Sequence, residues 1–119
     1  MILAVRIKLV VAETPEVALP GVKLSLYDRD QQSMDDFLGT GVTNENGECR
    51  IVFDSDAYTD EEDRPLWRLD SLPDLYVMVY NAQGEVLIST RKHVEDNNLP
   101  QLITIGVPEE LAIREGLIL

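Results

Sequence analysis

Apolar and polar residues alternate with a period of two along most of the chain, and this pattern limits the fold more than any other feature. Near the N-terminus, Val5, Ile7 and Leu9 fall on one side of an extended backbone. Arg6 and Lys8 fall on the other side. This segment is therefore predicted to be a strand with one solvent-exposed face. The same alternation predicts seven strands in all, near residues 5–11, 22–27, 37–43, 49–53, 75–80, 86–90 and 102–107.

Turn signals separate these strands. Residues 44–47, Asn-Glu-Asn-Gly, and 81–84, Asn-Ala-Gln-Gly, are typical of hairpin turns, because Asn and Gly tolerate positive φ angles. Gly39 and Gly41 in the third strand indicate a bulge or a close backbone approach. Short strands joined by turns, with no long helix, predict an all-β fold: a seven-stranded antiparallel Greek-key sandwich.

The sequence also predicts two short helical segments outside the strands. Pro108 and Gly116 bracket a helix-like pattern, so a short C-terminal helical tail is expected over 108–119. A further helical turn anchored by Trp67 is expected between residues 60 and 72. We therefore expect one β-sandwich domain over 1–119, with its core in 3–107, because 119 residues is the length of one domain.

Charge and cysteine usage restrict location and partners. Twenty-two acidic residues against ten basic ones leave a net charge of −12, which opposes binding to nucleic acid and, unless calcium mediates it, to an anionic membrane. Cys49 is the single cysteine, so no intrachain disulfide forms. Arg6 and Lys8 interrupt the apolar N-terminal run that a signal peptide would need, and a cytoplasmic location is the default expectation.

Aspartates gather where the second and fourth strands end. Strands that reverse at each turn bring these two places to the same end of the sandwich. Carboxylates spaced along loops supply the hard oxygen ligands that calcium prefers, and without a cation they repel one another. The predicted ligands are Asp28, Asp30, Asp35, Asp36, Asp54 and Asp56. The alternative is that these loops are polar and that Asp35 and Asp36 turn the chain before the third strand.

No complete enzyme motif is present in the sequence. His93 is the single histidine, and neither Ser89 nor Ser71 has a nucleophile-elbow sequence around it. Cys49 alternates in register with Ile51, which favours a small core residue over a reactive thiol. We therefore expect no catalytic residue, no resident cofactor other than calcium, and no enzymatic activity.

Two apolar groups have alternative interpretations. Trp67, Tyr76 and Tyr80 could form an exposed aromatic platform or could pack over a face of the sandwich. The apolar tail that ends at residues 117–119 could dock on its own domain or on a second subunit. An edge strand together with this tail makes self-association a reasonable expectation, alongside binding of a protein partner.

Residues 19–30 and 35–48 resemble the transthyretin-like and carboxypeptidase-regulatory-like sandwich domains. In those families a strand of the pattern gly-val-x-val-x-leu-x-asp precedes a gly-x-thr-asp-x-asn-gly hairpin, and residues 73–80 resemble a later strand of the same pattern. The resemblance runs over most of residues 3–107 and implies a prealbumin-like sandwich. The related 5-hydroxyisourate hydrolases use histidines, an arginine and a tyrosine-arginine-glycine-serine type C-terminus. This sequence lacks that set, so a small hydrolase is the disfavoured alternative.

Residues 27–39 alone resemble a calcium-binding loop of C2 domains, in which aspartates of this spacing hold calcium at a membrane. In C2 domains that loop comes late in the chain, whereas here only two strands precede it. The sequence thus predicts a non-enzymatic transthyretin-like sandwich that acts as a protein-interaction or accessory module. The alternative is a calcium-dependent binding domain.

Overall fold

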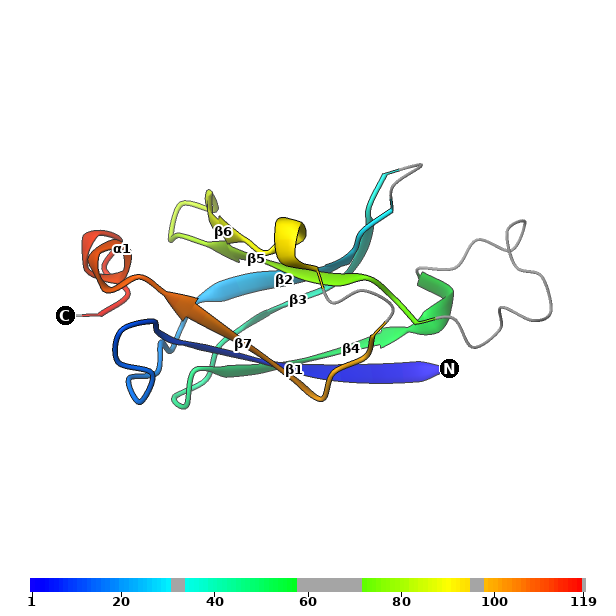
Figure 1. The fold of residues 1–119 in the computed structure, drawn as a ribbon, viewed down its shortest axis with the longest axis horizontal. Coiled ribbons are helices and arrows are strands. Elements are labelled where there is room, and N and C mark those ends of the chain that lie inside the picture. The colour runs from blue at the N-terminus through cyan, green and yellow to red at the C-terminus, as the bar shows by residue number, and fades with distance from the viewer. Residues whose placement is uncertain (31–33, 58–71, 95–97, 119) are drawn as a thin grey trace.

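The expected seven strands and C-terminal helix are present in the computed structural model of the chain, which describes residues 1–30, 34–57, 72–94 and 98–118 (Figure 1). The strands are β1 (Ile2–Val11), β2 (Lys23–Asp28), β3 (Asp36–Val42), β4 (Glu48–Asp54), β5 (Leu75–Tyr80), β6 (Val86–Ser89) and β7 (Leu102–Val107). Short 3-10 turns η1 (Ser55–Ala57) and η4 (Arg91–His93) follow β4 and β6, and α1 (Glu109–Arg114) follows β7.

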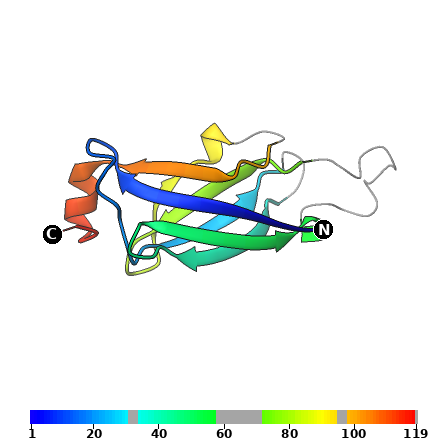
Figure 2. The same ribbon diagram turned by 90° about the horizontal axis from the view of Figure 1, so that it is seen from below.

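The strands form two sheets packed face to face. The smaller sheet has the order β4-β1-β7 and the larger has the order β3-β2-β5-β6 (Figure 2). The chain passes from one sheet to the other at the connections β1–β2, β3–β4, β4–β5 and β6–β7. The predicted all-β sandwich is confirmed.

The expectation of purely antiparallel pairing is wrong for one pair of strands. β1 and β7 run parallel, with Arg6 opposite Leu102 and Val11 opposite Val107. The reason is the crossover from β6, which brings the chain back into the smaller sheet beside the middle of β1 and in the same direction. All other pairs in both sheets are antiparallel.

The core lies between the sheets and consists of the inward residues of the alternating pattern. Ile7 and Leu9 of β1, Leu24 and Leu26 of β2, and Val77 of β5 are fully buried. Removing such side chains from water is the main force that holds the sheets together. Cys49 lies in the same cluster as a free buried thiol, as predicted, and burial raises its pKa.

Both predicted hairpin turns are held by an asparagine side chain that accepts two backbone hydrogen bonds. The side-chain carbonyl of Asn44 accepts hydrogen bonds from the backbone N–H groups of Asn46 (2.9 Å) and Glu48 (3.1 Å). Asn81 repeats this arrangement with Gln83 and Glu85. The asparagine side chain thereby replaces a backbone acceptor and holds the chain in a tight reversal.

The two glycines of β3 allow the sheets to close against each other on one side. A Cβ atom at position 39 would lie 2.6 Å from Ile51 Cγ2, and one at position 41 would overlap Cys49 Sγ. Both contacts come from inward side chains of β4, which belongs to the smaller sheet. The predicted close approach at Gly39 and Gly41 is confirmed, and it explains why β3 lacks side chains at these points.

The C-terminal tail folds onto its own domain. Ala112 of α1 is buried, and Leu111, Leu117 and Ile118 pack against the core. The helix ends as predicted before Gly116, which has a φ of 71°. No helix among the described residues is long and apolar enough to cross a bilayer. The helical turn expected around Trp67 lies outside the described residues.

The close approach at Gly41 leads to a first prediction. Substitution Gly41→Ala should lower the free energy of unfolding by about 1–3 kcal/mol, because the new methyl group collides with the Cys49 thiol. Urea denaturation of the purified chain measures this loss. In a Cys49→Ala background the same substitution should cost clearly less, because the sulfur is gone. Strictly additive losses in this double-mutant cycle would contradict the contact.

Candidate functional site

The predicted acidic residues do gather at one end of the sandwich. β2 ends at Asp28 and β3 begins at Asp36, and these two residues are direct cross-strand partners. β4 ends at Asp54 at the same end, where the η1 turn that follows it contacts β3 (Figure 1). The prediction that the two acidic segments reach the same end is therefore confirmed.

Asp28 is a buried carboxylate, only 8% exposed. Its Oδ1 accepts a 2.7 Å hydrogen bond from the backbone N–H of Asp74, just before β5. Burial raises the pKa of Asp28 to about 7, and the negative charges of Asp36, Asp74 and Asp30 act in the same direction. The hydrogen bond from Asp74 opposes this shift only in part. Four carboxylates thus surround the junction of β2, β3 and β5.

Asp35 has a different role, because its carboxylate is bound by three groups. Arg91 Nε lies 2.7 Å from Asp35 Oδ2, and Arg91 Nη2 lies 3.2 Å from Oδ1. The hydroxyl of Tyr76 donates to Oδ2 at 2.5 Å, and the Asp30 N–H donates to Oδ1 at 3.0 Å. These donors, Arg91 above all, hold the pKa of Asp35 well below its usual range. Burial and the hydrogen bond to the Asp35 carboxylate raise the pKa of Tyr76. Asp35 therefore fastens the β2–β3 loop to β5 and to the η4 turn.

Asp54 and Asp56 form a local turn at the end of β4. The Asp54 carboxylate accepts a 3.1 Å hydrogen bond from the backbone N–H of Asp56. Within the described ranges, the structure contains no group of three or more Asp, Glu, His or Cys side chains arranged to hold a metal ion. Calcium binding by the six predicted aspartates stays a prediction.

The sequence did not reveal an aromatic row across the outer face of the larger sheet. Tyr27 of β2 stacks on Tyr76 of β5, with ring centroids 5.3 Å apart and planes at 11°. Phe37 of β3 meets Tyr27 edge-on at 5.6 Å. The guanidinium of Arg91 lies 6.0 Å from the centroid of the Tyr76 ring, and the Lys23 ammonium lies 5.8 Å from that of Tyr80. Rings from three neighbouring strands thus form one continuous surface.

For Tyr76, this row decides between the two interpretations given above, an exposed aromatic platform and packing over a face of the sandwich. Tyr76 is 2% exposed because Tyr27 and Arg91 cover it, so it packs and is not itself a platform. Phe37, at 55% exposed, forms the open end of the row. The outward alternation of β2 and β5 was visible in the sequence. Their pairing, which brings Tyr27 and Tyr76 together, was not.

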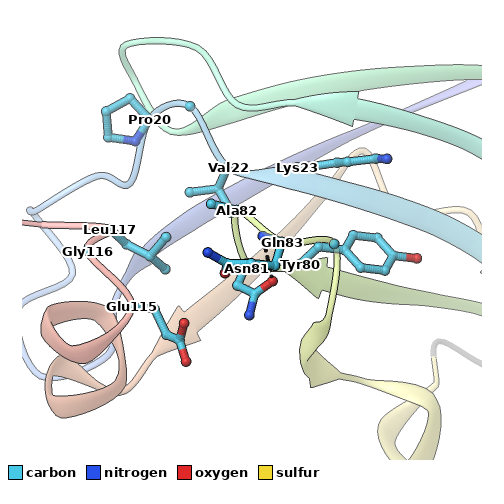
Figure 3. Close-up of a pocket in the computed structure, with 12 residues that line it drawn as sticks. Pro20, Val22, Lys23, Tyr80, Asn81, Ala82, Gln83, Glu115, Gly116 and Leu117 are labelled. Carbon is cyan, nitrogen blue, oxygen red and sulfur yellow. Dashed lines mark hydrogen bonds between the residues drawn. The ribbon is translucent and has the colours of Figure 1, made fainter.

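An open pocket of about 470 Å³ lies at the opposite end of the sandwich (Figure 3). Three segments line it: residues 20–23 before and at the start of β2, residues 80–84 of the β5–β6 turn, and residues 115–117 after α1. Figure 3 shows the Lys23 side chain extending away from Glu115, so the two charges do not converge on one point. The polar side chains of the lining are those of Lys23, Tyr80, Asn81, Gln83 and Glu115.

Comparisons with known proteins support the fold. Neither a family model nor a curated protein sequence matches the chain. Among solved structures, a 9R-lipoxygenase from Cyanothece is similar over 90% of this chain, with a TM-score of 0.56 and 22% sequence identity. The chain spans only 16% of the length of that protein. At this identity the similarity shows a shared fold and nothing about activity.

The buried carboxylate at Asp28 leads to a prediction about pH. Its raised pKa means that the folded state binds a proton more tightly than the unfolded state, so stability should fall as the pH rises from about 4 to about 7. Asp28→Asn keeps an oxygen acceptor for the Asp74 N–H but removes the charge. The variant should be more stable than the unsubstituted chain at pH 8, on the order of 1–3 kcal/mol, and equal to it near pH 4.

Denaturant titrations at several pH values measure this difference. Asp36→Asn is the matched control, because it removes a neighbouring charge while Asp28 keeps its own. The control should retain most of the pH dependence between 4 and 7. Identical pH profiles for the Asp28→Asn variant and the unsubstituted chain would show that Asp28 is not the titrating group.

Proposed function

We propose that the chain is a non-enzymatic β-sandwich module that binds another protein through the outer face of its larger sheet. The observation that carries this proposal is the aromatic row on that sheet, beside which further apolar side chains are exposed. Phe37 and Val42 of β3 are 55% and 59% exposed, and Val86 of β6 is 50% exposed. Half-buried Tyr27 and Tyr80 lie on the strands between them. Apolar surface that collects on one face marks an interaction site.

The composition and rigidity of this face support the proposal. Aromatic residues and arginine are enriched at protein interfaces, and both are present in the Phe37–Tyr27–Tyr76–Arg91 row. Tyr27 is held between two rings, and Asp35 fixes Arg91 through two hydrogen bonds. Side chains that are already ordered lose little conformational entropy when a partner binds. As parts of the same proposal, we group the chain with transthyretin-like domains and place it in the cytoplasm.

Substitution of the exposed face tests this function. Phe37→Ser combined with Val42→Thr should reduce the capture of a protein partner by about tenfold or more, because exposed anchors of this kind dominate interface energies. Val52→Thr is the matched control, since Val52 is 48% exposed but lies on β4 in the other sheet. Affinity capture with quantitative mass spectrometry, followed by titration of the purified partner, measures the loss. Equal capture by all three chains would refute the proposed face.

The second candidate function is calcium-dependent binding at the acidic end. The observation in its favour is that the negative charges of Asp36, Asp74 and Asp30 act on the buried Asp28, an unfavourable interaction that a divalent cation would relieve. This function predicts that millimolar calcium raises the melting temperature and that EDTA reverses the change. Asp28→Asn and Asp36→Asn should each weaken the shift. A melting temperature that does not respond to calcium would eliminate this candidate.

A further inference from the structure

The two sheets are unequal, and this leaves one strand without an opposite neighbour. Glycines of β3 pack against β4, so the three strands β4-β1-β7 lie across from β3-β2-β5. β6 extends the larger sheet by one more strand, and no strand among the described residues lies across from it. β7 is the outer strand of the smaller sheet on this side (Figure 2).

The outer edge of β7 has backbone groups without a hydrogen-bond partner among the described residues. The carbonyls of Gln101 and Val107 accept hydrogen bonds from the backbone N–H groups of Arg6 in β1 and of Ala12 just after it, so the odd-numbered residues point their N–H and C=O groups toward β1. Because successive residues of a strand point these groups to opposite sides, those of Leu102, Thr104 and Gly106 point to the outer edge. All three residues are exposed. This edge provides an alternating row of donors and acceptors.

β7 also lacks the features that protect edge strands from pairing. Its sequence, Leu-Ile-Thr-Ile-Gly-Val, contains no charge and no proline, and its pairing with β1 is regular throughout. The other edges differ: β3 has a register irregularity and begins at an aspartate, β6 is short and irregular, and β4 carries charged residues and packs against β3. β7 is thus the edge best suited to accept another strand.

Incompletely covered aliphatic side chains lie beside this edge. Ile88 of β6 and Ile103 of β7 point toward the core but are only half-buried, and Leu99 before β7 is half-buried as well. On the opposite side of the sandwich, where β3 meets β4, the inward residues Leu38 and Ile51 are buried. An added strand next to β7 would cover Ile88 and Ile103 with its own inward side chains.

We propose that β7 accepts an extended segment of another protein as a fourth strand of the smaller sheet. The occupant is a single strand and not a second copy of this chain. In each chain the larger sheet is one strand wider than the smaller sheet. If β7 paired with β7 of a second copy about a two-fold axis, the larger sheets of the two copies would therefore occupy the same space. The net charge of −12 favours a cationic segment, whose alternate side chains are aliphatic and face Ile88 and Ile103.

Amide exchange with a defined probe tests this proposal. The probe is a synthetic peptide that alternates lysine or threonine with valine. In the free protein the outward amides of Leu102, Thr104 and Gly106 should exchange fast, whereas the inward amides of Ile103 and Ile105 are protected. Saturating peptide should slow the outward amides by about tenfold or more, as a new ladder of hydrogen bonds forms. A matched peptide with proline in its centre should have a much smaller effect.

Variants of the chain separate this edge from the outer face of the larger sheet. Thr104→Pro removes an outward N–H without breaking a bond to β1, so the fold should persist while peptide binding is lost. Thr104→Val keeps the N–H and should bind normally, and Ile88→Ala should weaken binding several-fold. The Phe37→Ser, Val42→Thr chain should bind the peptide normally. Failure of the outer-face proposal therefore leaves the strand-edge result intact.

Three outcomes would overturn the proposal. The first is the absence of any change at β7 amides with millimolar peptide, a measurement on the unsubstituted chain that does not depend on whether a variant folds. The second is a peptide effect confined to residues around Phe37. The third is protection of the outward amides that rises with protein concentration alone, which would assign the edge to a second copy.

Discussion

Burial of the inward half of each strand is the interaction on which the rest of the structure depends. Each strand except β6 has buried residues on its inward face, and residues such as Ile7, Leu24 and Val77 lose their contact with water only when the two sheets meet. Because side chains alternate, this burial also decides what points outward. Tyr27 and Tyr76 lie on the outer face of the larger sheet because Leu26 and Val77 beside them lie in the core.

The same constraint explains the distribution of charge. A carboxylate in the core would require costly removal of its water, so the acidic residues of a chain with net charge −12 collect where strands end. Asp28 is the exception, since it closes β2 with its side chain turned inward and has a pKa of about 7. Asp35 avoids this conflict because Arg91 forms an ion pair with its carboxylate and Tyr76 donates a hydrogen bond to it. Two neighbouring acids therefore differ in charge state near neutral pH for reasons of local geometry.

Much of the fold could be predicted because its causes are local. The Asn44 and Asn81 turns depend on residues within four positions, and the helix end depends on Gly116. The functional surface could not be predicted in the same way. Asp35 and Arg91 are 56 residues apart, and only the pairing of β2 with β5 and the path of η4 bring them into contact. No local pattern specifies that pairing.

The sequence alone determined that this protein is a β-sandwich, because short alternating strands joined by turns, with no long helix, can bury their apolar faces only against one another. It also determined where the chain turns and that the acidic segments following the second and fourth strands lie at the same end. The tertiary structure decided the parallel pairing of β7 with β1, the three-over-four arrangement of the sheets and the aromatic row on the larger one. These features depend on which strands become neighbours, and alternation specifies the faces of a strand but not its neighbours.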